Sequence, residues 1–299
     1  MAMENVLKKK NKSKTLLERR FGADKVLFTI VFIIFVIQAL SLFLPVFWML
    51  ISSLKGRWEY DHGNPFAFPE KWEFDNYVQA FSMLSAGDTL FWGMIWNSIW
   101  YTVIVTGLGA FVPSVTGYVM SKYRFPGRHM IFTVAITCMV IPIVGNTASF
   151  MKLVAALGIN DTPLFAVITS LGGFGGSFLV YYGFFNSVSW SYAEAAEIDG
   201  AGDSLVFFKI MLPQAMPILL TYSITGAITN WNEYNTMILY LPSYPTLASG
   251  LFEYQSNAVR GADYPVYYAG LLISMIPTIT LFALFSNRVM TSISLGGLK

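Results

Sequence analysis

Apolar residues occur along this chain in long uninterrupted runs rather than in short alternating patches. Six stretches contain no Asp, Glu, Lys or Arg, and each is long enough to cross a bilayer. A helix rises about 1.5 Å per residue, so roughly 20 apolar residues cover a hydrocarbon core of ~30 Å. The pattern therefore predicts six membrane-spanning segments, at 26–54, 89–121, 129–151, 162–193, 210–232 and 264–287.

Helices are the expected spanning element, because lipid offers no partner for an unpaired backbone group. The stretches 89–121 and 162–193 are longer than one crossing requires, so part of each is expected at the interface. The fifth helix is expected to continue past Glu233 to about Leu241, because 234–252 is also free of charge. The predicted fold is an all-α membrane protein with a basic first segment 1–25, a membrane domain 26–289 and a tail 290–299.

Composition supports a membrane protein. Of the 299 residues, 55% are hydrophobic and only 12% are charged, and the mean hydropathy is +0.55. The single cysteine, Cys138, excludes a disulfide framework and a multi-cysteine metal site, and it is expected to be a small buried hydrophobe. A net charge of +2 is too small to indicate a nucleic-acid partner.

The placement of positive charge predicts the orientation. If the amino terminus is cytoplasmic, most of the 19 Lys and Arg residues lie on the cytoplasmic side. The positive-inside rule then places both termini in the cytoplasm. The loop 55–88, rich in aromatic and turn residues, is expected outside as an interfacial cap. The basic start is interpreted as the flank of a retained first span, since the apolar run after it is too long for a signal peptide.

A short acidic and alanine-rich segment, "EAAEIDG", follows the charge-free stretch 162–193 on the predicted cytoplasmic side. Ser191 and Glu194 have the spacing of a capping box, which predicts a helix beginning at Tyr192. The alanines favour the helix and Gly200 is a natural stop.

A second short helix is expected directly afterwards. Asp203 can cap it, Pro213 is expected to break it, and Pro217 is expected to open the fifth span. The segment 189–213 is thus predicted to be a helix–turn–helix elbow. From these residues alone, the elbow could also be a plain connector in which Glu194 only caps a helix.

The elbow resembles the EAA signature of ABC importer permeases, which is EAA, three residues, Gly, nine residues, then I-x-LP. The chain also resembles the MalG-like carbohydrate permease family over nearly its whole length, in the family's order: "NSIWYTVIVT" from Asn97, "YVMSKYRFPGR" from Tyr118, "LGINDT" from Leu157, "WNEY" from Trp231 and the terminal "SLGGLK". The fixed positions of the signature are filled by Glu194, Ala195, Ala196, Gly200, Ile210, Leu212 and Pro213.

The resemblance implies a type I ABC importer transmembrane domain whose elbow, including Asp199, is a coupling helix seated on a cytoplasmic ATPase. It implies a heterodimer with a second permease, two ATPase subunits that bind ATP and Mg, and an external solute-binding protein. It implies no cofactor on this chain and no catalytic residue. The tail residues Gly296, Gly297, Leu298 and Lys299 resemble the segment that reaches the ATPase, although a frayed end is the alternative.

One position departs from the family pattern. The family usually has a proline shortly before the EAA helix, whereas this chain has Ser189 and Trp190 there. The approach to the coupling helix is therefore expected to be shaped differently, through a contact of Trp190.

Polar residues within spans usually face a cavity or the interior of a bundle. In the fifth span, Gly226, Asn230, Glu233 and Met237 are expected to form one helical stripe. A carbohydrate path is therefore predicted, and the alternative is that the residues are interhelical contacts. The candidate path residues are Asn230, Trp231, Asn232, Glu233, Tyr234 and, from the third span, Asn146.

The sequence gives little support for an enzyme. The only histidines are His62 and His129, and the chain lacks the H-E-x-x-H, G-x-S-x-G and Walker motifs. The rival functions are an ion-coupled secondary transporter that uses Glu233, and an ABC permease for a solute other than sugar. The expected function is the permease subunit of an importer for an oligosaccharide or related glycan, in the cell membrane.

Overall fold

A computed structural model describes the backbone of residues 2–141, 145–257 and 262–295 and the side chains of 25–141, 145–257 and 262–285. The chain divides into two compact units, Met1–Glu73 and Phe74–Lys299.

The first unit consists of the long helix α1, Ala2–Ser53, the short helix α2, Arg57–His62, and the loop around it. The charge-free part of α1 is long and apolar enough to cross a membrane. The loop folds back onto the end of α1, because the buried Lys55 ammonium donates to the carbonyl of Asn64 at 2.9 Å and the Trp48 indole donates to that of Pro65, also at 2.9 Å.

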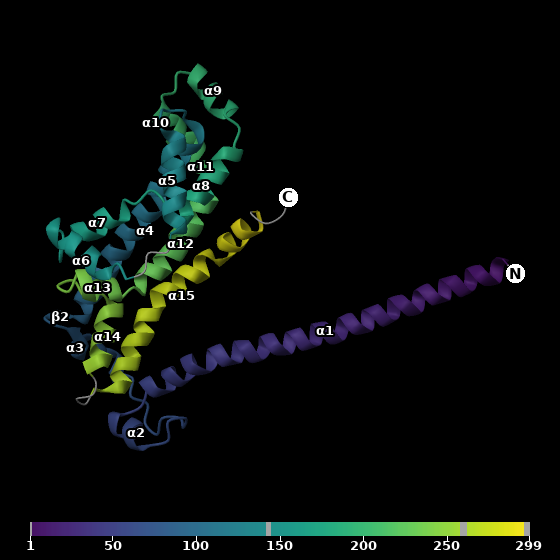
Figure 1. Cartoon of the computed structure of the whole chain (residues 1–299). Helices are drawn as coiled ribbons and strands as arrows, with labels where there is room; N and C mark the ends of the chain where they lie inside the picture. The colour runs from purple at the N-terminus through teal and green to yellow at the C-terminus, as the bar shows by residue number, and fades with distance from the viewer. Residues whose placement is uncertain (1, 142–144, 258–261, 296–299) are drawn as a thin grey trace. The chain divides into compact units, whose positions relative to one another are not determined.

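The second unit is built from helices and one small hairpin (Figure 1). Strands β1, Ser85–Ala86, and β2, Thr89–Leu90, pair antiparallel, with Ser85 opposite Leu90. The helices are α3 Asp75–Met83, α4 Phe91–Lys122, α5 Arg128–Val140, α6 Thr147–Ala156, α7 Leu164–Ser170, α8 Gly176–Ser187, α9 Ser191–Ile198, α10 Asp203–Val206, the π-helical turn η1 Phe207–Met211, α11 Leu212–Gln214, α12 Met216–Trp231, α13 Asn235–Tyr240, α14 Leu247–Asn257 and α15 Tyr264–Leu295.

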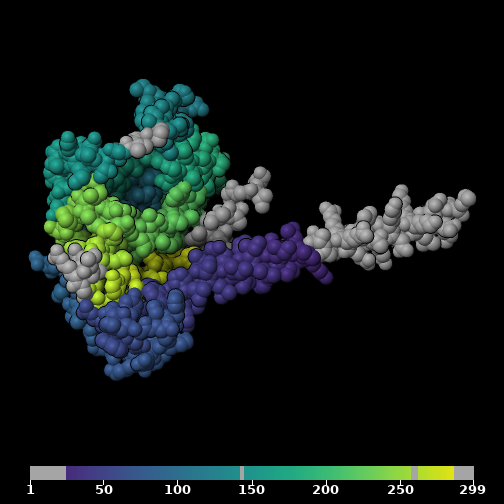
Figure 2. Space-filling model, turned by 60° about the horizontal axis from the view of Figure 1, so that its bottom comes forward, coloured from purple at the N-terminus to yellow at the C-terminus, as the bar shows by residue number. Residues whose placement is uncertain are grey.

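Helix α4 is the centre of this unit, with α8 and α12 packed along it and α15 packed on α12. Gly117 allows the approach of α8, because a Cβ there would lie 2.7 Å from the Cβ of Tyr181. Helices α9 and α10 lie at one end of the unit, called the elbow end here, and α3 and α14 lie at the other, called the α14 end (Figure 1). The surface of the unit is hollowed between its teal and green parts (Figure 2).

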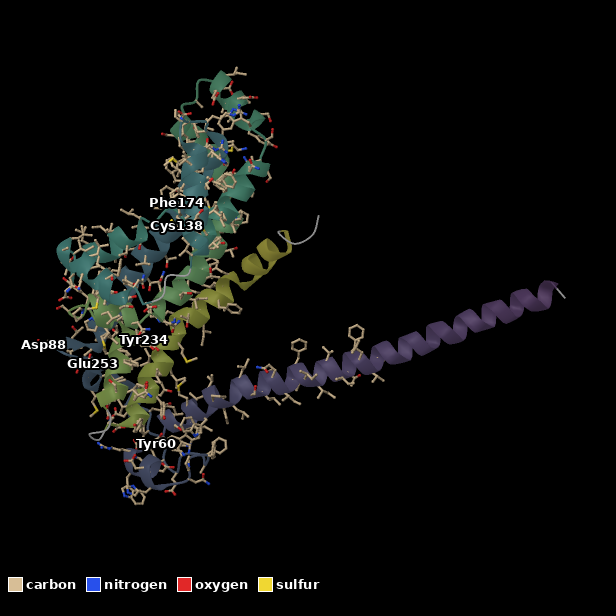
Figure 3. The ribbon with its side chains drawn as sticks, viewed as in Figure 1. Tyr60, Asp88, Cys138, Phe174, Tyr234 and Glu253 are labelled. Atoms are coloured by element: carbon tan, nitrogen blue, oxygen red, sulfur yellow. The ribbon has the colours of Figure 1, made fainter. Side chains whose placement is uncertain are left out.

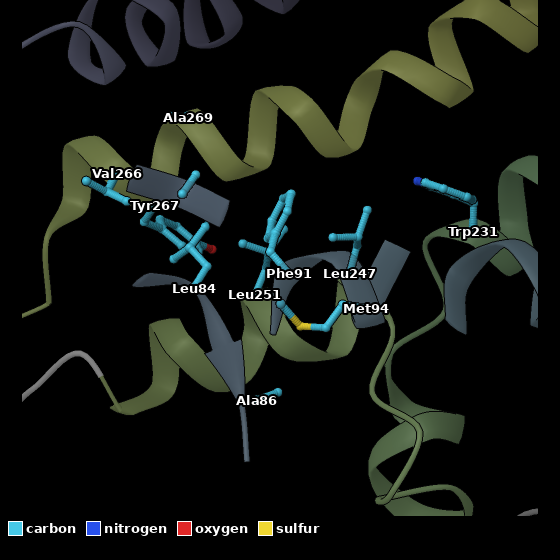
Figure 4. Close-up of a cluster of buried hydrophobic side chains, with 11 residues drawn as sticks. Leu84, Ala86, Phe91, Met94, Trp231, Leu247, Leu251, Val266, Tyr267 and Ala269 are labelled. Carbon is cyan, nitrogen blue, oxygen red and sulfur yellow. The ribbon is translucent and has the colours of Figure 1, made fainter. Parts of the chain in front are cut away.

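A buried apolar cluster joins the helices at the α14 end (Figure 4). Phe91 and Met94 of α4 meet side chains of α14 and α15 in it, and Phe91 is fully buried. Gly250 of α14 packs against Met94, since a Cβ there would lie 2.0 Å from the sulfur and would force the methionine side chain to move. This end is therefore a packed platform rather than a set of loose loops.

The predicted spans are found as helices, but three are interrupted. The third stretch is divided between α5 and α6, and the fourth is broken between α7 and α8 at a glycine-rich segment. Gly173 in that break passes so close to α4 that a Cβ would lie 2.4 Å from the Thr116 hydroxyl oxygen. Within the described residues, three helices are long and apolar enough to span a membrane, or four if a bent pair counts as one.

The fifth stretch differs most from its prediction. Residues Asp203–Gln214 and Met216–Trp231 meet at an angle of 74°. Helix α12 then ends at Trp231 instead of continuing to Leu241. Glu233, which follows it, accepts the backbone N–H of Thr236 at 2.9 Å in the first turn of the separate helix α13. The predicted continuous stripe from Gly226 to Met237 is therefore wrong beyond Trp231.

The prediction that Cys138 is buried is also wrong. Its side chain is exposed on α5, whose only buried residue is Ala135. In Figure 3, Cys138 lies near Phe174, and both line a cavity of about 510 Å³. The apolar residues around Cys138, which suggested burial, instead form an exposed surface that is suited to contact with lipid.

Candidate functional site

The EAA segment forms the first helix of the elbow, α9, and ends as the sequence predicts. Gly200 has a φ of +84°, a conformation that favours glycine. Its N–H donates to the carbonyl of Glu197 at 3.0 Å, and the N–H of Ala201 donates to that of Ala196 at 2.9 Å. These two bonds are a Schellman motif, which satisfies carbonyls at the end of the helix.

The start of α9 differs from the predicted capping box. The helix begins at Ser191, and Trp190 precedes it without a side-chain capping bond. The Ser191 hydroxyl is instead 2.8 Å from that of Ser189, and the N–H of Glu194 donates to the Trp190 carbonyl at 3.1 Å. Ser191 therefore lies inside the helix rather than before it, and the Glu194 carboxylate is exposed and caps no backbone N–H among the described residues.

The second elbow helix also starts without the predicted cap. Gly202, rather than Asp203, precedes α10, and Asp203 is its first residue. The Asp203 carboxylate accepts a hydrogen bond from the hydroxyl of Tyr123 at 3.0 Å. Burial, followed by interaction with the Tyr118 hydroxyl and then by the bond to Asp203, raises the pKa of Tyr123, so the phenol stays protonated as a donor.

The elbow is fixed to the ends of α4 and α8 by a second buried cluster, called the elbow cluster here. It joins Ala193 and Phe207 of the elbow to Tyr118 of α4 and to Tyr181 and Phe185 of α8. Ala193 is fully buried, because its small side chain allows α9 to pack directly on the cluster. The elbow therefore moves with α4 and α8 unless this cluster opens.

The other signature residues fall into two groups by exposure. Ala195, Asp199, Gly200 and Pro213 are exposed with Glu194, whereas Ala196, Ile210 and Leu212 are half-buried. The chain does not break at Pro213, which lies inside α11, but bends at the buried Ala215 that follows this helix. Pro217 lies in the first turn of α12, as predicted.

The exposed face of α9 carries a residue that the sequence did not single out. Ile198 is 86% exposed, although it lies among acidic residues at the end of a short helix. Tyr192 on the same helix is 56% exposed. Large exposed apolar side chains beside a free carboxylate are typical of a surface that another protein covers.

The candidate path residues lie at the opposite end of α12 from the elbow, as Tyr234 in Figure 3 indicates. Asn230 donates to the Thr106 hydroxyl of α4 at 3.0 Å, and the Trp231 indole donates to the Ser274 carbonyl of α15 at 2.9 Å. Both side chains thus connect helices, which agrees with the packing alternative. Asn232, directly after α12, donates to the Ile228 carbonyl of that helix at 2.8 Å.

A small cavity lies beside these residues. It measures about 220 Å³ and is lined by Trp231, Asn232, Tyr234, Phe252, Gln255 and Tyr267, among others. The rings of Tyr234 and Phe252 are stacked with centroids 4.6 Å apart. Phe252 and Gln255 come from α14, so only the folded chain brings them to Tyr234.

Other predicted residues do not line this cavity, including Asn230 and Glu233. Asn146 lies before α6 with an exposed side chain, and in the described part of the chain that side chain makes no hydrogen bond. The tail residues Gly296, Gly297, Leu298 and Lys299 lie outside the described residues.

Residues 113–294 match the family described as binding-protein-dependent transport system inner membrane component. The diacetylchitobiose uptake system permease protein NgcG of Streptomyces coelicolor is 28% identical over 93% of this chain and 89% of its own length. The melibiose/raffinose/stachyose import permease protein MelC of Bacillus subtilis is 27% identical over 88% of this chain and 94% of its own.

A solved structure has the same fold. It is a bacterial ABC transporter involved in the import of the acidic polysaccharide alginate, with a TM-score of 0.71 and 23% identity over 89% of this chain and 97% of that one. The family match covers more than half of the sequence and includes the whole elbow. The chain belongs to the inner membrane components of binding-protein-dependent transport systems.

Proposed function

We propose that this chain is a permease subunit of an ATP-binding cassette importer that carries an oligosaccharide across the cell membrane. The relatives support a sugar cargo, since they are named for diacetylchitobiose, for melibiose, raffinose and stachyose, and for arabinooligosaccharides. ATP and Mg bind to separate ATPase subunits, and this chain performs no catalysis.

The construction of the elbow is the observation that carries this proposal. The elbow cluster fixes the elbow to α4 and α8, and the bend at Ala215 continues it into α12. A displacement applied to the exposed face of α9, with Glu194, Ala195 and Ile198, is therefore passed to the helices that reach the α14 end. Asp199 and Gly200 complete that face, and Ile210, Leu212 and Pro213 form its connection to α12.

The proposed membrane arrangement has six crossings with both termini in the cytoplasm. The crossings are α1, α4, α5, the pair α7 and α8, α12, and α15. The elbow, 189–213, then lies inside and the loop 55–88 outside, within a membrane domain of 26–289. The basic segment 1–25 and the tail 290–299, with Gly296, Gly297, Leu298 and Lys299 near the ATPase, complete the cytoplasmic side.

The solute path is proposed to run past Asn230, Trp231, Asn232, Glu233 and Tyr234, with Asn146 at its edge. The cavity of about 220 Å³ is smaller than the roughly 300–1,000 Å³ of ordinary ligand pockets. A second permease subunit is therefore proposed to supply the facing wall. In a related solved structure, an alginate transporter is in complex with an alginate pentasaccharide-bound periplasmic protein, and a binding protein is proposed to deliver solute here in the same way.

The test is reconstitution of the chain with a partner permease, ATPase subunits and a solute-binding protein in proteoliposomes. Oligosaccharide-loaded binding protein should stimulate ATP hydrolysis and drive sugar into the vesicles. Stimulation by an amino acid or another non-sugar solute, with none by oligosaccharides, would refute the cargo. Failure of the chain to assemble with an ATPase would refute the function.

A further inference from the structure

Tyr123 contacts the beginnings of both elbow helices. It follows the last residue of α4, and its ring lies edge-to-face against Trp190, with centroids 6.1 Å apart. Its hydroxyl donates to the Asp203 carboxylate at 3.0 Å. Trp190 directly precedes α9 and Asp203 is the first residue of α10, so one side chain holds two helix starts.

The backbone of Tyr123 is itself held in place. Its N–H donates to the Val119 carbonyl of α4 at 3.1 Å, and its carbonyl accepts from the Arg128 guanidinium at 3.3 Å. Next to it, the Lys122 ammonium donates to the Val188 carbonyl just before the elbow. Tyr123 is therefore anchored to α4 and to the start of α5.

The connection between the two elbow helices needs such a support. Only Asp199 to Gly202 lie between α9 and α10, and two of these four residues are glycines. The elbow cluster supplies apolar burial, which is not directional. A hydrogen bond has a preferred distance and angle, so the Tyr123 phenol can set the angle of α10 relative to α4.

We propose that Tyr123 is a positioning residue that holds the coupling elbow in a fixed orientation on α4. A movement of the ATPase then displaces the elbow and α4 together. The proposal rests on the proposed function of the elbow. Tyr123 does not itself form the docking surface, which is the exposed face of α9. Loss of its hydroxyl should leave ATPase binding intact but lower the amount of sugar imported per ATP hydrolysed.

The variants are Tyr123→Phe, which keeps the ring, Asp203→Ala, and the double variant. Tyr182→Phe is the matched control, because Tyr182 is a half-buried tyrosine of α8 whose hydroxyl makes no hydrogen bond in the described residues. All are purified as the full complex, and sugar imported per ATP hydrolysed is measured in proteoliposomes. Hydrogen exchange of the segment 200–212 is measured on the same preparations.

Tyr123→Phe is expected to lower the sugar imported per ATP by about twofold to tenfold, the range that the net strength of one hydrogen bond implies. Exchange in 200–212 should become faster, whereas exchange at the α14 end should not change. Asp203→Ala should have a similar effect, and the double variant should be no worse than the stronger single one. Tyr182→Phe should match the unmodified complex in both measurements.

Unchanged exchange in Tyr123→Phe would show that the hydroxyl does not hold the elbow, and would overturn the proposal. Faster exchange with an unchanged transport ratio would overturn the positioning role while leaving the contact in place. If the unmodified complex imports nothing with ATP, the proposed function fails and the role fails with it, whichever way the exchange result falls.

Discussion

Gly200 and Gly202 offer a matched pair for testing the geometry of the elbow. A Cβ added at either glycine would meet no atom within 4 Å, so neither substitution creates a clash. They differ in the backbone, since φ is +84° at Gly200 and −78° at Gly202. Comparing Ser at Gly200 with Ser at Gly202 therefore isolates the cost of the left-handed backbone conformation from the cost of adding a side chain to this segment.

Ser at Gly200 must adopt a left-handed conformation, which costs an L-residue roughly 1–2 kcal/mol. Ser at Gly202 meets an ordinary extended backbone directly before α10, where a serine cap is favourable. We expect Gly200→Ser to increase local opening of α9 by roughly fivefold to thirtyfold, as that free energy implies. Gly202→Ser should leave opening unchanged or reduce it.

The assay is hydrogen exchange of amides in α9, measured on the assembled complex under conditions where exchange reports local opening. Gly200→Asn is a further check, because Asn tolerates the left-handed region better than Ser and should lie between the two. Equal effects of Ser at both glycines, or none at Gly200, would refute the argument that the Schellman turn depends on glycine.

Three further predictions concern docking, topology and the solute path. Glu194→Ala should weaken recovery of the ATPase in pull-down without unfolding the chain, because the exposed carboxylate caps nothing in this structure; recovery equal to the unmodified chain would count against a docking role. In a Cys138→Ser background, Asp88→Cys should react with an impermeant thiol reagent added to sealed cells, whereas Ile198→Cys should not; the reverse labelling would overturn the proposed orientation. Asn230→Ala should reduce the yield of folded chain if its bond to Thr106 is a packing contact, which contributes about 0.6–2 kcal/mol between membrane helices; normal yield with reduced uptake would instead support a direct solute contact.

The sequence predicted the elbow well because its signals are local. A glycine at the right distance ends α9 and alanines allow close packing, and both are visible within one short segment. The predicted caps were wrong because capping preference is also a local signal, whereas the actual helix starts depend on distant contacts. Ser191 and Asp203 are residue types that favour the N-cap position, but each lies inside its helix. The Asp203 carboxylate instead accepts a hydrogen bond from Tyr123, 80 residues away.

The break in the fifth span shows the limit of hydropathy patterns. The residues after Glu233 are as apolar as those before it, so composition predicts one continuous helix. In the structure α12 ends at Trp231 and α13 begins at Asn235, and the Glu233 carboxylate between them accepts the N–H of Thr236. The polar side chains from Asn230 to Tyr234 mark the break, but they predicted a solute path or interhelical contacts rather than the end of a helix.

The cavity at the α14 end could not be assembled from the sequence. Tyr234 was singled out, whereas Phe252 and Gln255 look like ordinary residues of a short loop helix. They reach Tyr234 because α14 packs on α4 and α15, with Gly250 against the Met94 side chain. Such a contact depends on the shapes of distant elements, which no local pattern specifies.

The energy source of transport tests the central claim most directly. The complete complex would be reconstituted in proteoliposomes with oligosaccharide-loaded binding protein, and sugar uptake would be measured with ATP and no ion gradient, then with a proton or sodium gradient and no ATP. Uptake that requires ATP and the binding protein, and is indifferent to the gradients, is the predicted result. Uptake that follows an ion gradient without ATP, and is lost in Glu233→Gln, would contradict the account and identify a secondary transporter.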